Sequence, residues 1–257
     1  MTPTEYVRPT TIPEALKALQ RGTALAGGTT LAPRARHFAS LVDLQALGLE
    51  TLTAEAGQVR LGAMLRLQQL VEAERGVPEA LAEATRLEAG LNLRNTASLA
   101  GSLIGCSGRS PLATALLALH AQVRLEPGPV QWSLDEMLDR RVTELQGRLV
   151  IEIAFQTPRT MAYAGVARSP ADRPIVCVAV VLLQGRAPAF GVALGGFGPR
   201  PRLVVDAEKA LASGEIEAAA QAIEAACSSS DDAWASAEYR GRAAAALLRR
   251  LAGEVGR

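Results

Sequence analysis

The sequence contains few of the residues that build metal centres and nucleophilic active sites. Its 257 residues include only two histidines and three widely separated cysteines, namely His37, His120, Cys106, Cys177 and Cys227. The cysteines have neither metal-ligand spacing nor a disulfide framework, which indicates a reducing compartment, and we expect a cytoplasmic protein. Histidine-rich metal sites and most Ser-His-Asp arrangements are hard to build from two histidines. We therefore expect no metal site and no catalytic side chain.

The chain also lacks an excess of charge and long apolar runs. Its 27 basic and 26 acidic residues give a net charge of +1, too little to attract nucleic acid or an anionic membrane. No apolar run reaches the roughly 20 residues of a membrane span, and the N-terminus lacks the features of a signal peptide. Since 49% of the residues are hydrophobic, the chain can bury a large core in two or three subdomains.

A small α/β subdomain is predicted over residues 1–55. Thr11 and Glu14 have the spacing of a capping box, and the helix that they begin ends at Gly22. The other expected elements are a strand over 23–26, a short helix from Pro33 and a strand over 41–44. The order of these elements is typical of a small α/β fold.

Two further subdomains are predicted, over residues 56–157 and 158–257. In the first, we expect strands over 58–62, 122–126 and 149–155, helices over 67–74, 78–88 and 111–119, and a loop over 92–109. In the second, we expect strands over 175–183 and 189–194 and helices over 205–212, 214–227 and 233–252. The last helix is expected to turn Trp234 toward a core. The whole chain is thus predicted to have an α+β fold.

Two loops of small residues are the most informative segments. The first, over residues 25–33, contains the pair Gly27-Gly28, and the second covers residues 95–102. Glycine lets backbone N–H groups approach a ligand closely, and a helix that follows such a turn adds a favourable dipole for an anion. Two such loops can hold one long anionic cofactor at two points, which favours a dinucleotide site. The alternatives are a tight strand-to-helix turn and a crossing loop packed between subdomains.

The ordered set of motifs resembles the FAD-binding (medium) subunit of the molybdopterin dehydrogenase family, which includes xanthine dehydrogenase and carbon monoxide dehydrogenase. The motifs are the opening 5–9, Ala26-Gly27-Gly28-Thr29, the strand 41–44, residues 94–103, residues 168–176, Gly195-Gly196-Phe197-Gly198-Pro199 and Ala237-Glu238-Tyr239-Arg240. The resemblance implies a two-part FAD-binding domain of the PCMH (vanillyl-alcohol-oxidase-like) type. A C-terminal antiparallel sheet with a helical bundle would follow it.

The resemblance also implies a function as an electron relay. In this family, FAD takes electrons from an iron–sulfur (2Fe–2S) subunit beside a large molybdopterin-binding subunit, and passes them to NAD, oxygen or another acceptor. By the resemblance, the residues that contact FAD are Ala26, Gly27, Gly28, Thr29, Thr30 and Leu31 in the first loop, Thr96, Ser98, Gly101 and Ser102 in the second, and Tyr163 and Asp172. The substrate of the complex and its electron acceptor stay open.

Some positions depart from the family pattern. Ala100 stands where the family commonly has glycine, and Pro111 stands where an aspartate is common. They motivate an alternative function, a scaffold or assembly subunit that has lost FAD. Tyr163 is equally consistent with a core residue, and Asp172 with a surface ion pair to Arg168. Arg109 is either a cation near a pyrophosphate or a solvated side chain. An unrelated nucleotide enzyme is disfavoured because no phosphate-loop lysine follows the glycines.

Overall fold

The computed structural model describes residues 5–31, 38–170 and 172–256, and its contacts divide the chain into two compact units. The first unit contains Met1–Ala73, Leu91–Gly105 and Gln122–Ala154, and the second contains Glu74–Gly90, Cys106–Ala121 and Phe155–Arg257. Two segments of the range 56–157 therefore group with the C-terminal part of the chain. The three-part division predicted from the sequence stays a prediction about domain organisation. The helix predicted from Pro33 lies outside the described residues.

A parallel three-stranded sheet begins the first unit. Its strand order is β1-β3-β2, with β1 at Glu5–Val7, β2 at Thr23–Leu25 and β3 at Ser40–Asp43. Helix α1 (Ile12–Leu19) has the predicted capping box, in which Thr11 and Glu14 satisfy each other's backbone N–H groups. Its buried residues Ala15 and Leu19 share a core with Val42 of β3. The sequence thus predicted α1, β2 and β3 to within a few residues, whereas strand β1 was not expected.

The first unit also contains a mainly antiparallel sheet of five strands. Its order is β4-β5-β8-β6-β7, with strands at Leu52–Glu55, Gln58–Gly62, Leu149–Gln156, Gln122–Glu126 and Val130–Ser133 respectively. The remaining short elements of this unit are the 3-10 helix η2 (Gln45–Leu47) and helices α2 (Leu67–Val71), α4 (Leu91–Arg94), α5 (Leu99–Ile104) and α7 (Leu134–Arg140). The predicted strands 58–62 and 122–126 are confirmed, whereas β4, β7 and α7 were not expected.

The prediction of a continuous loop over residues 92–109 was wrong. The segment contains most of α4 and all of α5, which begins after Ser98. The Ser98 side chain accepts a hydrogen bond from the N–H of Gly101, a normal N-cap contact. Helix α5 is only six residues long. Its small residues and its lack of an amphipathic repeat over two turns hide it from a periodicity argument.

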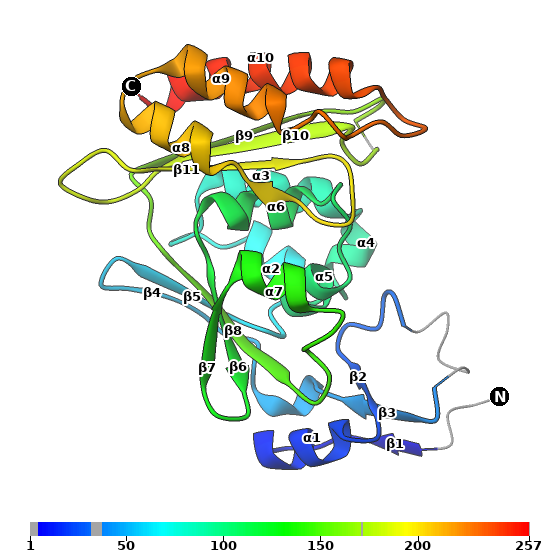
Figure 1. Ribbon diagram of the computed structural model, residues 1–257. Coiled ribbons are helices and arrows are strands. Elements are labelled where there is room, and N and C mark those ends of the chain that lie inside the picture. The colour runs from blue at the N-terminus through cyan, green and yellow to red at the C-terminus, as the bar shows by residue number, and fades with distance from the viewer. Residues whose placement is uncertain (1–4, 32–37, 171, 257) are drawn as a thin grey trace. The chain divides into compact units, whose positions relative to one another are not determined.

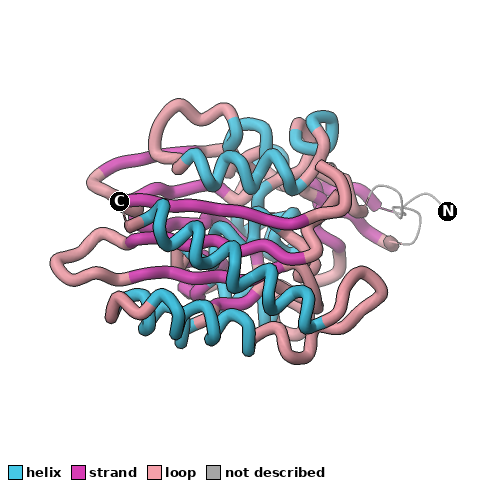
Figure 2. The backbone as a smooth tube through the Cα atoms, turned by 90° about the horizontal axis from the view of Figure 1, so that it is seen from above, coloured by secondary structure: helices cyan, strands magenta, loops and turns pink. Residues whose placement is uncertain are grey.

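A four-stranded antiparallel sheet forms the centre of the second unit. The order is β12-β11-β10-β9, with strands at Arg202–Leu203, Phe190–Gly195, Val176–Leu182 and Thr160–Val166 respectively. Figure 1 shows α3 (Glu79–Glu88) and α6 (Pro111–Ala118) on one face of this sheet, and α8 (Val205–Ala212), α9 (Ile216–Ala225) and α10 (Ala237–Val255) on the other. Figure 2 looks down on α8, α9 and α10, which lie over the strands. The C-terminal antiparallel sheet with helices is therefore confirmed.

Burial on both faces explains the composition of this sheet. All eight residues of α6 are buried, and so are six of the seven residues of β10. Helices that are apolar all round and strands without polar alternation are typical of elements covered on every side. A Cβ atom at Gly191 of β11 would overlap the carbonyl oxygen of Ala118, so glycine permits the close approach of α6.

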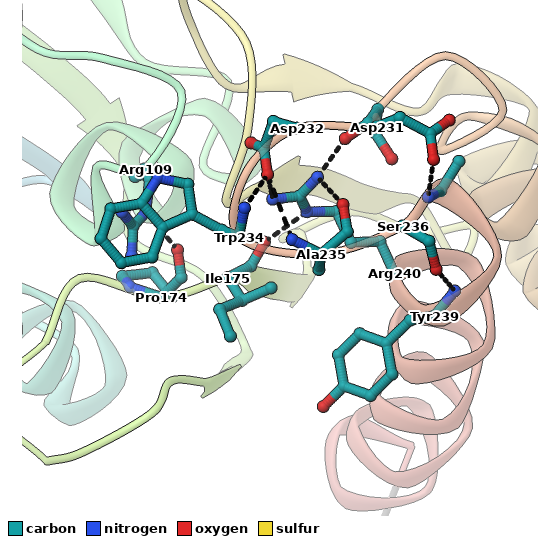
Figure 3. Close-up of polar contacts among 12 residues, drawn as sticks. Arg109, Pro174, Ile175, Asp231, Asp232, Trp234, Ala235, Ser236, Tyr239 and Arg240 are labelled. Carbon is teal, nitrogen blue, oxygen red and sulfur yellow. Dashed lines mark hydrogen bonds and ion pairs between the residues drawn. The ribbon is translucent and has the colours of Figure 1, made fainter.

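The expectation that Trp234 turns toward a core was wrong, because α10 begins at Ala237 and not at residue 233. Trp234 precedes the N-cap Ser236 and is 44% exposed. The loop before the helix is instead held by Arg240, which is fully buried. The Arg240 guanidinium donates to the carbonyl oxygens of Ile175 at 2.9 Å and Ala235 at 3.1 Å, and pairs with Asp232 at 2.7 Å (Figure 3).

No helix of the described segments is long and apolar enough to cross a bilayer.

Candidate cofactor site

The structure brings the two loops of small residues together within the first unit. A Cβ atom at Gly27 would overlap the carbonyl oxygen of Thr96 and lie 2.9 Å from the Cα atom of Ala97. A Cβ atom at Gly101 would lie 3.8 Å from the Cβ atom of Ala26. The first loop therefore crosses the second in van der Waals contact, and glycine at position 27 is required for that contact.

Three backbone N–H groups of the first loop have no acceptor within the described part of the chain. Among the residues that the structure describes, no acceptor faces the N–H groups of Gly27, Gly28 and Thr29. Gly28 has a positive φ of 72°, a left-handed conformation that favours glycine. All three residues are half-buried, while Thr30 is exposed and Leu31 is half-buried. This arrangement of free N–H groups fits an anionic group of a cofactor.

The second loop differs because every N–H group over residues 95–102, except that of Ser98, has an acceptor inside the protein. Leu99 donates to the carbonyl of Leu65 at 2.8 Å, and Ala100 donates to the carbonyl of Ala63 at 3.0 Å. Gly101 donates to the Ser98 hydroxyl at 3.3 Å. Ser98 is only 2% exposed and serves as the N-cap of α5, whereas Thr96 is exposed and Ser102 is half-buried.

Two pockets adjoin the contact between the loops, and both are lined by Ala26 and Met64. One, of about 180 Å³, is polar and is also lined by Gly27, Gln45, Glu50, Arg66, Asn95, Thr96 and Ser98. The Arg66 guanidinium pairs with Glu50 at 3.3 Å in this pocket. The other, of about 190 Å³, is mainly apolar and is also lined by Ala24, Leu44, Leu49, Ala63, Ala100, Ile104, Leu145, Arg148, Leu149 and Val150.

Two further predicted site residues, Tyr163 and Asp172, belong to the second unit. They line a common pocket of about 400 Å³ with Arg168 and Arg250. Tyr163 is 6% exposed, and its hydroxyl makes no hydrogen bond of normal geometry within the described part of the chain. Burial, followed by the neighbouring Cys177 thiol, raises the pKa of Tyr163 well above its usual value. The phenol is therefore neutral at physiological pH.

Arg109 contacts an aromatic ring and backbone carbonyl groups within the second unit. Its guanidinium carbon lies 4.2 Å from the centroid of the Trp234 ring, and its Nε donates to the carbonyl oxygen of Pro174 at 2.9 Å (Figure 3). A second contact runs to the carbonyl oxygen of Arg173. The guanidinium carbon of Arg168 also stacks on the Trp234 ring, 4.9 Å from its centroid. No ion pair between Arg168 and Asp172 is found among the described residues. Cation–π stacking thus accounts for both arginines.

A carboxylate that the sequence did not reveal lies at the N-terminus of α6. Pro111 occupies the first turn of this helix, and Ser110 caps it. Glu88 of α3 accepts hydrogen bonds from the Ser110 hydroxyl at 2.6 Å and from the N–H of Leu112 at 3.2 Å, and pairs with Arg173 at 3.2 Å. Burial raises the pKa of the Glu88 carboxyl, against the ion pair and the hydrogen bonds. No local sequence pattern around position 88 predicts the contact of Glu88 with the start of α6.

The described segments contain no group of three His, Cys, Asp or Glu residues placed to hold a metal ion. All three cysteines are buried, and none of them forms a disulfide bond in the described part of the chain.

Comparisons with known protein families identify the class of protein to which this fold belongs. Residues 2–155 match the family described as the FAD binding domain in molybdopterin dehydrogenase, and residues 161–255 match the CO dehydrogenase flavoprotein C-terminal domain. The chain belongs to the FAD-binding family of molybdopterin dehydrogenases. This confirms the family and the cofactor, FAD, that were expected from the sequence, together with the predicted fold class.

Individual relatives support the assignment. The uncharacterized protein YgfM of Escherichia coli strain K12 is 30% identical over 212 residues, which cover 80% of this chain and 79% of YgfM. A chain of the cyanide-inactivated Cu,Mo-CO dehydrogenase has a TM-score of 0.83 at 23% identity, with 99% of each chain covered. A chain of quinoline 2-oxidoreductase from Pseudomonas putida 86 has a TM-score of 0.82 at 21% identity, with 98% and 96% covered. These two structures share the fold.

Proposed function

We propose that this chain is the FAD-carrying electron-transfer subunit of a molybdopterin-dependent oxidoreductase complex. The observation that carries the proposal is the contact between the two loops, with a polar and an apolar pocket on either side of Ala26 and Met64. A dinucleotide has the matching chemistry, since it joins a flat apolar ring to a charged diphosphate. Family membership supplies the identity of that dinucleotide.

The first unit offers hydrogen-bond donors for the diphosphate of FAD and an apolar pocket for its adenine ring. The free N–H groups of Gly27, Gly28 and Thr29 are donors for the diphosphate, as in other anion-binding turns. The exposed hydroxyl of Thr96 and the half-buried hydroxyl of Ser102 are donors from the second loop. The apolar pocket lined by Ala26 and Ala100 has the chemistry to receive the adenine ring. Bound FAD supplies the redox chemistry, and the chain supplies binding and orientation.

For the second unit, we propose that Tyr163 and Asp172 contact the cofactor, as the family resemblance implies. They share a pocket, and the neutral Tyr163 phenol presents a polar edge without a charge. No general base is required of them, because electron transfer through a flavin leaves the bond chemistry to the cofactor.

The partners in this proposal are an iron–sulfur (2Fe–2S) subunit and a large molybdopterin-binding subunit. The support is the matched family and the Cu,Mo-CO dehydrogenase whose chain shares this fold. Electrons would arrive from the iron–sulfur subunit and leave for NAD, oxygen or another acceptor. Three buried cysteines without a disulfide bond among the described residues suit the reducing cytoplasm, where we place the complex.

A second candidate is a scaffold subunit that has lost FAD. The observation that favours it is the second loop, whose N–H groups at Leu99, Ala100 and Gly101 already have protein acceptors. In that case the chain would contribute interfaces and no redox chemistry.

The visible spectrum of the chain, purified without added cofactor and then incubated with FAD and desalted, tests the two candidates. The electron-transfer proposal expects flavin absorption bands after desalting, with bleaching by dithionite. A protein that stays colourless after incubation with FAD contradicts it and supports the scaffold. Co-expression with a ferredoxin-like and a molybdopterin-binding chain then tests the partners by co-purification.

A further inference from the structure

The polar pocket beside the first loop contains an ion pair that no sequence motif indicated. Among the residues that line this pocket, the charged ones are Glu50 and Arg66, whose side chains meet at 3.3 Å. We propose that Arg66 is a side-chain ligand of the FAD diphosphate, and that its guanidinium exchanges Glu50 for phosphate when the cofactor binds. This role of Arg66 rests on the proposed function, because it concerns the same cofactor.

The backbone of Arg66 is fixed against the second loop. Its N–H group donates to the Gln69 side chain at 2.8 Å. Arg66 also forms an antiparallel bridge with Ser98, and next to this bridge the N–H of Leu99 donates to the carbonyl oxygen of Leu65 at 2.8 Å. Residues that lie directly opposite each other in such a bridge project from the same side of the paired backbones. The Arg66 side chain therefore starts at a fixed place in the wall of the pocket.

The guanidinium at the end of the side chain is held much less firmly. The exposed fraction of the Arg66 side chain is 49%, and that of the Glu50 side chain is 38%. Nε faces Glu50, Nη1 makes a long contact of 3.5 Å with the carbonyl oxygen of Asn95, and Nη2 has no acceptor among the described residues. A guanidinium has several N–H donors and can bind a phosphate with two of them at once. Because an exposed ion pair contributes little to stability, exchanging the carboxylate for a phosphate costs little.

The charges of the pocket predict opposite effects for the two partners. If Arg66 binds the diphosphate, loss of its charge weakens FAD binding, whereas loss of the Glu50 charge removes a repulsion and releases the guanidinium. If the pair only stabilises the fold, either change removes the same contact, and both variants change in the same direction. The sign of the effect on FAD affinity therefore separates a cofactor ligand from a structural ion pair.

Fluorescence titration of the full chain with FAD tests the inference with Arg66→Gln and Glu50→Gln. We expect FAD to bind about tenfold more weakly to Arg66→Gln and about threefold more tightly to Glu50→Gln. Arg60→Gln is the matched control, because Arg60 pairs with Glu152 at 3.4 Å in the same unit but lines neither pocket beside the loops. Its FAD affinity should stay within about twofold of that of the unaltered chain.

The salt dependence of binding gives a second measurement. Added salt should weaken FAD binding to the unaltered chain more than to Arg66→Gln, since a contact between charged groups is screened. Arg66→Lys keeps the charge without the planar fork, and its affinity should lie between those of Arg66→Gln and the unaltered chain. Thermal melting verifies that the variants are folded. Any other pair of signs for folded Arg66 and Glu50 variants, while the unaltered chain binds FAD, overturns the inference. If the unaltered chain binds no FAD, the proposed function has failed as well.

Discussion

At the scale of single residues, Arg240 shows how a buried charge organises a loop. It is fully buried, yet its guanidinium meets one carboxylate and the carbonyl oxygens of Ile175, Ser230 and Ala235. Asp232 also accepts from the N–H of Trp234 at 2.7 Å, so the loop before α10 is fixed through the same carboxylate (Figure 3). A buried cation is tolerated only when its donors are satisfied in this way.

Replacement of Arg240 is expected to destabilise the second unit strongly. Arg240→Met removes the donors and leaves buried carbonyl groups unpaired, at a cost of about 2–4 kcal/mol in the free energy of unfolding. Arg242→Met is the matched control, because Arg242 is an exposed residue of the same helix that pairs with Glu238, and its loss should cost less than about 0.5 kcal/mol. Urea denaturation of both variants measures the difference, and equal stabilities would show that the buried contacts contribute little.

At the scale of elements, local sequence signals predicted some features and missed others. The capping box at Thr11 and the alternation over 58–62 gave α1 and β5 correctly. A second capping box, between Ser133 and Glu136, marks α7 and was overlooked. Strand β9 contains small residues, with Gly165 next to its C-terminal end, so its pairing with β10 is a tertiary effect. Burial in the sheet, rather than local propensity, decides such a strand.

The contact between the two loops is an element-scale feature that glycine controls. Gly27→Ala places a Cβ atom against the carbonyl oxygen of Thr96, so the loops must separate. We expect FAD affinity to fall about tenfold or more, with a stability loss of about 1–3 kcal/mol from overpacking. Gly90→Ala is the control, since no atom lies within 4 Å of a Cβ atom at that position. Fluorescence titration with FAD and thermal melting report both effects; unchanged FAD binding in Gly27→Ala contradicts the proposed site.

The contact between His120, which follows α6, and Glu208 of α8 should make the free energy of unfolding depend on pH. The Nε2 atom of His120 lies 3.2 Å from a carboxylate oxygen of Glu208, and this hydrogen bond raises the pKa of His120 above 6.5. The charged form is favoured in the folded state, so the contribution is complete below the unfolded pKa and is lost as pH rises through the raised value. Relative to His120→Gln, the chain should therefore lose stability as the pH is raised from about 6.5, the ordinary pKa of histidine, to more alkaline values. Urea unfolding at several pH values measures this, and a constant difference between the two proteins would refute the contribution.

At the scale of the whole molecule, the sequence predicted the family and the two loops. It did not predict the tertiary hydrogen bonds that the second loop makes. The ordered motifs were sufficient to predict the fold, whereas the close approach of a ligand that the glycines indicate stays a prediction. The engagement of the Leu99 and Ala100 N–H groups depends on the carbonyls of Leu65 and Ala63, some 35 residues away in sequence. The carboxylate of Glu88 at the start of α6 likewise comes from another helix. Contacts of this kind are set by tertiary packing and leave no local pattern.

The proposed FAD site has a polar and an apolar pocket. Comparing the binding of FAD with that of FMN therefore tests the proposed site most directly. FMN carries the flavin and one phosphate but lacks the adenosine half, which we propose binds in the apolar pocket beside Ala26 and Ala100. Calorimetric titration of the cofactor-free chain should show one FAD bound per chain, with FMN at least about tenfold weaker. Absence of saturable FAD binding, or equal affinity for FMN, would contradict the account.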